Sequence, residues 1–215
     1  SIMGINYGSQ TLRLTKSVGD LTYYQRAGST ISRKKVLTNT SKTEAQQANR
    51  CIQGEAGHLC KRLLLPLQLG FQRPKRGLSG ANMFIRQNRK AVTATKNENT
   101  MQYEATVDYS QLQLSDGDLF IPEVTATVDT EQHCVTFKIA EAMSVGRVYP
   151  DDVLIGVIYE KGFEICMVQE LGKRSDVGDV PVTLPDKFDM SAVEIYAFAL
   201  NRKRKDASLT VYLST

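Results

Sequence analysis

The stretch Val18–Arg50, VGDLTYYQRAGSTISRKKVLTNTSKTEAQQANR, joins two strand-like runs and the start of a helix without interruption. Tyr, Thr, Ile and Val are frequent on both sides of Gly28, and these residue types favour β-strands. Glycine adopts positive φ angles at little cost, so it suits a tight turn between two strands. We therefore predict a β-hairpin with its turn near Gly28, formed by strands 21–25 and 30–37.

A long amphipathic helix is predicted to follow this hairpin and to end at Pro66. Near its start, Ser41 and Glu44 have the spacing of a capping box. Apolar residues then recur every three or four positions, as they do on one face of a helix: Ala45, Ala48, Ile52, Ala56, Leu59 and Leu63. Gly54 and Gly57 each weaken a helix by up to about 1 kcal/mol relative to Ala, so we interpret them as sites of close packing.

A basic loop and a second helix come next. Residues 70–80, GFQRPKRGLSG, combine Pro74 with several cations and predict irregular structure. Ser79 has the position of an N-cap, because its side chain can accept a backbone hydrogen bond at the start of a helix. The polar residues 93–100 are interpreted as a linker, and we place a domain boundary at residue 100.

Beyond residue 100 the apolar pattern changes to a period of two, which is typical of half-buried strands. Short strands joined by Asp, Gly, Pro and Lys turns favour a two-sheet antiparallel sandwich, and we expect immunoglobulin-like topology. The fold class predicted is therefore mainly β, with an N-terminal hairpin or arm and two helices before the sandwich. The predicted strands are 103–107, 123–128, 134–139, 153–159, 163–170, 180–184, 193–200 and 208–213.

The charge is divided unequally along the 215 residues. Residues 1–100 contain 17 Lys and Arg against four acids, whereas residues 101–215 contain 10 against 19. Such polarity steers partners by sign and allows copies of a chain to stack head to tail. We therefore divide the chain into a basic arm, hairpin and helical module, 1–100, and an acidic β-sandwich domain, 101–215.

Over nearly its whole length the chain resembles an uncharacterised family of proteins from Bacteroidetes bacteria and their mobile elements. The signature lies in the stretch 18–50 quoted above, and weaker similarity continues at Gly80–Asn82, Asp108–Ser110, Leu112, Leu114 and Val211–Leu213. The family has a small-residue turn, a Tyr-Tyr strand, a Gly turn, an Arg-Lys strand and a Thr-x-x-Gln helix start. Lys35 departs from it, because the family more often has a small residue or proline there. The resemblance implies a shape and a link to mobile elements, and it brings no catalytic residue. The matching residues are Gly19, Tyr23, Tyr24, Arg26, Gly28, Arg33, Lys34, Thr43 and Gln46.

The sequence contains none of the short motifs that usually mark catalysis or metal binding. It has no GxSxG elbow, P-loop or HExxH motif, and its four cysteines form no Cys-x-x-Cys pair. His58 and His133, the two histidines, do not give a common zinc spacing with these cysteines. We expect no enzyme activity, no cofactor and no metal, with all cysteines reduced.

The location expected is the cytoplasm of a bacterial host or a virion. No apolar run approaches the ~20 residues of a membrane helix, and the first residues lack the layout of a signal peptide. We expect a structural or interaction protein, such as a component of a phage particle, that forms homo- or hetero-oligomers through its N-terminal module. The alternative is an accessory protein that binds nucleic acid through phosphate contacts, without sequence specificity.

The candidate interaction residues are basic or aromatic and lie in the first 100 residues. Tyr23 and Tyr24 alternate along a strand, so they are predicted on opposite faces, and either could belong to a core instead. A second basic run, Arg202–Lys205, lies at a predicted hairpin tip, where charge often guards against aggregation. The predicted residues are Tyr23, Tyr24, Arg26, Arg33, Lys34, Lys35, Arg73, Lys75 and Arg76.

Overall fold

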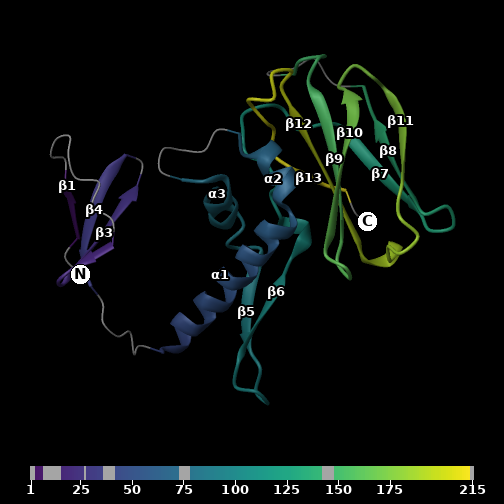
Figure 1. The fold of residues 1–215 in the computed structure, drawn as a ribbon. Helices are drawn as coiled ribbons and strands as arrows, with labels where there is room; N and C mark the ends of the chain where they lie inside the picture. Colours follow the sequence, from purple (N-terminus) through teal and green to yellow (C-terminus); the bar gives the residue numbers. More distant parts are fainter. Residues whose placement is uncertain are drawn as a thin grey trace.

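The computed structural model describes residues 3–6, 16–26, 28–35, 42–72, 78–141 and 148–213 (Figure 1). Within these ranges the chain is mainly β, with three α-helices and four antiparallel sheets, none of them closed. The elements are β1 (Met3–Asn6), β2 (Lys16–Val18), β3 (Leu21–Arg26), β4 (Ser29–Lys34), α1 (Glu44–Arg62), α2 (Leu64–Gly70), α3 (Gly80–Gln87), β5 (Val92–Lys96), β6 (Tyr103–Val107), β7 (Val124–Asp129), β8 (Cys134–Ile139), β9 (Val153–Glu160), β10 (Ile165–Lys173), β11 (Gly178–Thr183), β12 (Val193–Leu200) and β13 (Val211–Tyr212).

The sheet with strand order β10-β9-β12-β13 is covered on both of its faces. Side chains alternate along β9, so Leu154 and Ile158 pack with the sheet β11-β8-β7 while Ile155, Val157 and Tyr159 pack with the helices. Strand β12 behaves in the same way and is buried at every position. The helices, this sheet and the sheet β11-β8-β7 therefore make three layers with two hydrophobic cores. We call them together the body (Figure 1).

The helical segment 44–70 forms two helices, which corrects the prediction of one helix ending at Pro66. Helix α1 ends at Arg62 with Leu63 as its C-cap, and Pro66 lies in the first turn of α2, where the missing proline N–H is no loss. Thr43 is the N-cap of α1, with its hydroxyl accepting a hydrogen bond from the backbone N–H of Gln46. Ser41, predicted to cap this helix, lies outside the described residues. Ser79 caps α3 as predicted.

The segment 93–100 is not a linker, because most of it belongs to a hairpin. Strand β5 pairs with β6 along its whole length, from Val92 opposite Val107 to Lys96 opposite Tyr103. The charge boundary at residue 100 thus falls in the turn between two paired strands. Helix α1 contacts both strands, and the core beside it includes residues from 59 to 207. Elements before and after residue 100 pack against each other, so the change in charge at this residue does not separate two packed units.

All eight strands predicted after residue 100 are present, with shifts at their ends. The strand expected at 208–213 is the shortest, and β13 retains Val211 and Tyr212. The segment 112–119 runs beside this edge: Leu119 bridges Ser208, and the N–H of Leu119 donates to the carbonyl of Ala207 at 3.1 Å. The segment 112–119 therefore lies along the part of the sheet edge that is next to β13.

Candidate interaction surface

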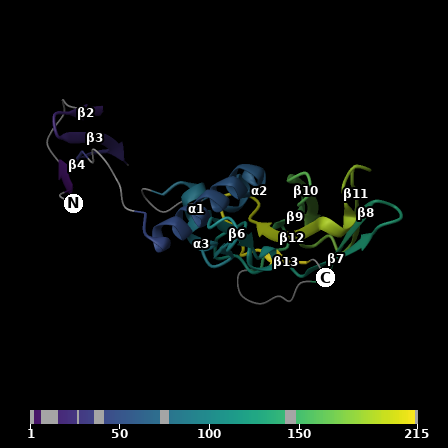
Figure 2. The same ribbon diagram turned by 90° about the horizontal axis from the view of Figure 1, so that it is seen from below.

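The strands β1-β4-β3-β2 form a small antiparallel sheet, which we call the N-terminal sheet. Figures 1 and 2 show it set apart from the body in both views. Strands β2, β3 and β4 follow one another as hairpins, and β1 pairs with β4 from Met3 opposite Arg33 to Asn6 opposite Thr30. The predicted hairpin is therefore confirmed and has gained one short strand on each side.

Glycine turns set the register of this sheet. Gly28 has a φ of 80°, in the loop that joins Arg26 to its partner Ser29. Gly19 has a φ of 57° between the paired residues Val18 and Leu21. Both angles lie in the left-handed region that glycine adopts most easily. The turn predicted at Gly28 is thus confirmed.

The N-terminal sheet places its basic and aromatic residues on two different faces. Tyr24 lies opposite Ile31, and the guanidinium of Arg33 stands 5.9 Å from the centre of the Tyr24 ring. Arg26 is two residues from Tyr24 and shares this face, which we call the Tyr24 face. Tyr23 and Lys34 point to the opposite face, as the alternation of a strand requires.

The predicted interaction residues are therefore only partly brought together. Tyr24, Arg26 and Arg33 share one face, while Lys35 follows the last strand and donates its backbone N–H to the carbonyl of Asp20 at 2.6 Å. The charge run Arg33–Lys34–Lys35 does not make one patch, because neighbouring strand residues alternate in direction. The remaining predicted residues, Arg73, Lys75 and Arg76, lie outside the described residues.

The N-terminal sheet buries little apolar surface. Among its described side chains only Ile31 is buried, at 8% exposure, whereas Leu21 is 40% exposed. Polar pairs cross between strands: Gln25 donates to Thr30 Oγ1 at 2.7 Å, and the hydroxyls of Ser17 and Thr22 lie 3.1 Å apart. Such exposed pairs contribute at most about 1 kcal/mol each.

A second polar cluster fixes α1 to the β9–β10 turn, and the sequence analysis did not predict it. Glu164 Oε1 lies 2.7 Å from His58 Nε2, and Glu164 Oε2 accepts from Arg62 at 3.0 Å. The hydrogen bond with His58, together with Arg62, lowers the pKa of Glu164 from its ordinary value in spite of partial burial. The fully buried Glu160 shapes the turn, because its carboxylate accepts the N–H groups of Gly162 and Phe163.

Tyrosines and one ion pair continue from this turn into the body. Lys161 Nζ lies 2.6 Å from Glu194 Oε1 and 5.4 Å from the centre of the Tyr109 ring. The Tyr212 hydroxyl donates to the other oxygen of Glu194 at 2.6 Å, and the Tyr196 hydroxyl donates to the Tyr109 carbonyl at 2.9 Å. Burial raises the pKa of both Tyr159 and Tyr196 far above that of free tyrosine. The ring of Tyr159 stacks on that of Tyr109, and the other groups named here are linked by hydrogen bonds or ion pairs, as is usual for buried polar groups.

A buried ion pair ties three loops together at the other end of the sheet. Arg174 and Asp152 are nearly inaccessible, with Nε and Oδ2 3.6 Å apart. Arg174 also donates to the carbonyls of Phe120 and Ile121, at 2.8 and 3.2 Å. Burial raises the pKa of Asp152, and the charge of Arg174 opposes that change only in part.

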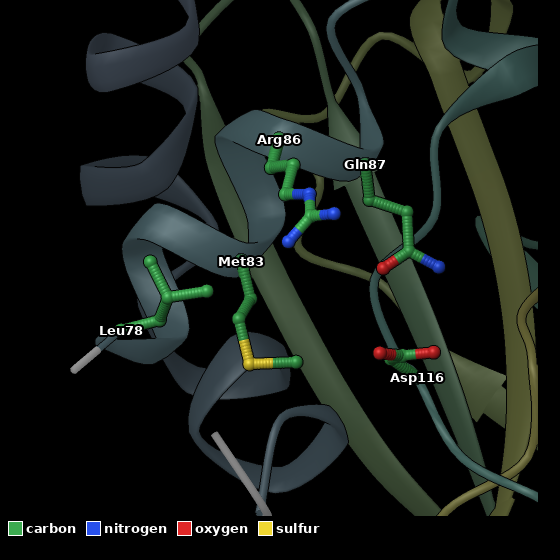
Figure 3. Close-up of a pocket in the computed structure, with 5 residues that line it drawn as sticks. All are labelled: Leu78, Met83, Arg86, Gln87 and Asp116. Atoms are coloured by element: carbon green, nitrogen blue, oxygen red, sulfur yellow. The ribbon is translucent and has the colours of Figure 1, made fainter. Parts of the chain in front are cut away.

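A hollow of about 230 Å³ lies beside α3 (Figure 3). Leu78 and Met83 form its apolar side, while Arg86 and Gln87 reach into it from α3 and Asp116 reaches into it from the segment 112–119. The described residues that line it include no nucleophile beside a general base. It therefore offers polar contacts without the geometry of a catalytic site.

The described part of the chain holds no group of three or more His, Cys, Asp and Glu arranged for a metal ion. Burial raises the pKa of the Cys60 thiol to about 11 and that of Cys166 to about 12, so both stay protonated at neutral pH. No described helix combines the length and apolar character needed to span a bilayer. No protein-family model, curated protein or solved structure matches this chain.

Proposed function

We propose that this protein is a non-enzymatic structural subunit that docks onto neighbouring subunits through its N-terminal sheet. The observation that carries this proposal is that a four-stranded sheet stands apart from the body with Ile31 as its one buried apolar residue among the described side chains. Small sheets need a covered hydrophobic face to be stable in water. A segment this short rarely supplies its own core without a disulfide, a metal or a partner.

The phage virion is the assembly we propose, because the resemblance described above points to mobile elements of Bacteroidetes. We further propose that the body has immunoglobulin-like topology. Its support is the strand order, with β7, β8 and β11 in one sheet and β10, β9, β12 and β13 in the other. Immunoglobulin-like domains divide consecutive strands between two sheets in this manner.

Deletion of residues 1–35 tests the proposal. The body keeps both cores, so its melting temperature should stay within error of that of the full chain. The native mass of the assembly, measured by light scattering or native mass spectrometry, should fall. An unchanged native mass would remove the N-terminal sheet from assembly and with it the proposed function.

Nucleic-acid binding is the second candidate, and the Tyr24 face favours it. Arg33 stacks near the Tyr24 ring, and an aromatic ring beside cations suits both a base and a phosphate. Fluorescence anisotropy with single-stranded DNA at increasing salt tests it, because phosphate contacts make affinity fall steeply with salt. If the Arg33→Glu variant binds DNA as tightly as the wild type, the Tyr24 face is not a nucleic-acid site.

A further inference from the structure

The N-terminal sheet is basic, and the part of the body that follows residue 100 is acidic. Residues 1–35 contain six Lys and Arg against one acid, and residues 101–215 contain 10 against 19. Oppositely charged surfaces attract over about one Debye length, ~10 Å at 0.1 M salt. A second copy of this chain therefore presents a surface of the right sign to the uncovered sheet.

One group of exposed acids lies at the end of the two packed sheets that holds the β7–β8 and β9–β10 turns. Three segments lie side by side there: the N–H of Leu184 donates to the His133 carbonyl at 2.8 Å, and the N–H of Lys161 donates to the Ala192 carbonyl at 3.0 Å. We call this region the acidic end. Its exposed charged residues are Asp129, Glu131, Asp186 and Asp189, with Lys187 among them, while Lys161 is paired with Glu194.

The acidic end also exposes apolar side chains. Phe163 is 59% exposed in the β9–β10 turn, and Val128 is 40% exposed beside Asp129. An exposed aromatic residue surrounded by charge has the composition of a protein interface. The Tyr24 face supplies the complement, because it combines the half-buried Tyr24 ring with the exposed Arg26 and Arg33.

We infer that the Tyr24 face of the N-terminal sheet docks onto the acidic end of the body of a second copy. The inference rests on the proposed function and names its partner. The contact joins two different surfaces, so a pair of copies keeps one free sheet and one free acidic end. Such head-to-tail contacts close into a ring or extend into a filament. The association weakens with salt, because charge contributes to it.

Two neighbouring residues give a matched pair of variants on the sheet. Arg33→Glu and Lys34→Glu change the net charge equally, but they alter opposite faces of β4. Analytical ultracentrifugation of the full chain should show that Arg33→Glu raises the dissociation constant at least about tenfold, the effect of one lost charged contact. Lys34→Glu should change it less than about threefold, as expected for a charge outside the contact.

A second pair of variants tests the receptor surface. Glu131→Lys with Asp186→Lys reverses the acidic end and should abolish self-association. Glu141→Lys with Asp151→Lys makes the same charge change at the opposite ends of β8 and β9 and should leave it intact. Circular dichroism verifies that each variant is folded.

Mixing the Arg33→Glu chain with the Glu131→Lys, Asp186→Lys chain completes the test. Each alone should associate more weakly than the wild type, and the mixture should regain a dimer, since one chain keeps its sheet and the other its acidic end. Self-association that persists in the Glu131→Lys, Asp186→Lys chain overturns the inference. In that case the proposed function still stands if deletion of residues 1–35 lowers the native mass. A wild type that stays monomeric at low salt also overturns the inference.

Discussion

Gly28 has a backbone conformation that few other residues adopt, and its surroundings leave room for a side chain. Nothing lies within 4 Å of a Cβ built at this position, so a substitution is opposed by the φ of 80° alone. We expect Gly28→Val to cost about 1–3 kcal/mol in the N-terminal sheet. Hydrogen exchange should quicken in residues 20–35 and stay slow in β9 and β12. Gly28→Asn is the control, because Asn tolerates positive φ, and equal exchange in the two variants would exclude backbone strain as the cause.

Gly117 is required for a different reason, the close approach of two chain segments. A Cβ at this position would lie 2.1 Å from the carbonyl oxygen of Ala207. The backbone must therefore move, and we expect Gly117→Ala to lower the free energy of unfolding by about 1–3 kcal/mol. Urea titration monitored by circular dichroism measures this change. The Gly54→Ala substitution should instead raise the free energy of unfolding.

The contrast with Gly54 shows what the sequence could predict at this scale. Gly28 was predicted correctly, because a glycine between two strand-like runs has one obvious role. Gly54 and Gly57 were interpreted as sites of close packing, and this was wrong: a Cβ at either position would meet nothing within 4 Å. A helical glycine has the same sequence pattern whether a neighbour touches it or not. Replacing Gly54 by Ala should stabilise α1 by about 0.5–1 kcal/mol.

Among the elements, the loops joined by Arg174 depend on one buried ion pair. Arg174→Met should cost about 3–5 kcal/mol, because it leaves Asp152 buried without its partner and frees the carbonyls of Phe120 and Ile121. The double variant Asp152→Leu, Arg174→Met removes both charges and should recover a part of that loss. Chemical denaturation of the two single variants and the double variant gives the coupling energy. Additive effects would show that the two charges do not stabilise each other.

The contact between α1 and the β9–β10 turn should depend on pH. The pKa of Glu164 is lowered in the folded protein from an ordinary value of 4.5. A lowered carboxyl pKa stabilises the fold above the unfolded pKa, and this contribution is lost as the pH falls below 4.5 through the folded pKa. Melting temperatures between pH 6 and pH 3 should therefore fall more for the wild type than for Glu164→Gln. Parallel curves for the two proteins would contradict this role of Glu164.

Strands β9 and β12 explain why the layers were harder to predict than the strands. Their sequences, VLIGVIYE and VEIYAFAL, are apolar almost without interruption, which is typical of strands covered on both faces. Both segments were correctly predicted as strands, but they were expected in a sandwich, in which one face of each sheet meets water. The uninterrupted apolar pattern indicates that both faces of each strand are apolar. It does not show that α1, α2 and α3 supply the cover, since that depends on contacts between distant segments.

For the whole molecule, the body should not fold without its helices. A fragment of residues 101–215 would expose the side of the sheet that carries Tyr159, Tyr196 and Phe198, all buried at present. Burial of such residues contributes on the order of 10 kcal/mol in total, which is comparable to the whole stability of a domain. We expect this fragment to aggregate, whereas 42–215 should be soluble and melt cooperatively. A cooperative melt of 101–215 alone would show that the acidic half is self-sufficient.

The candidate interaction residues were predictable as types and not as a surface. Tyr24, Arg26 and Arg33 share a face only because the turn at Gly28 pairs Tyr24 with Ile31. The acidic end brings together Glu131 and Asp186, which are far apart in the sequence, through contacts between turns. Charge counts along the chain indicate that it contains one basic and one acidic region. The sites where these regions present their charge follow from the packing of the sheets.

The burial of β12 between two layers also constrains the order of events during synthesis. Helix α1 ends at Arg62, and the strand against which its layer packs ends at Leu200. At about 5–20 residues per second, a ribosome needs roughly 7–28 s to add the intervening residues. Throughout that interval the helical layer lacks β12, although the β5–β6 hairpin that α1 contacts is complete at Val107. The nascent chain is thus a natural client for chaperones that hold exposed hydrophobic helices, until its last strands emerge.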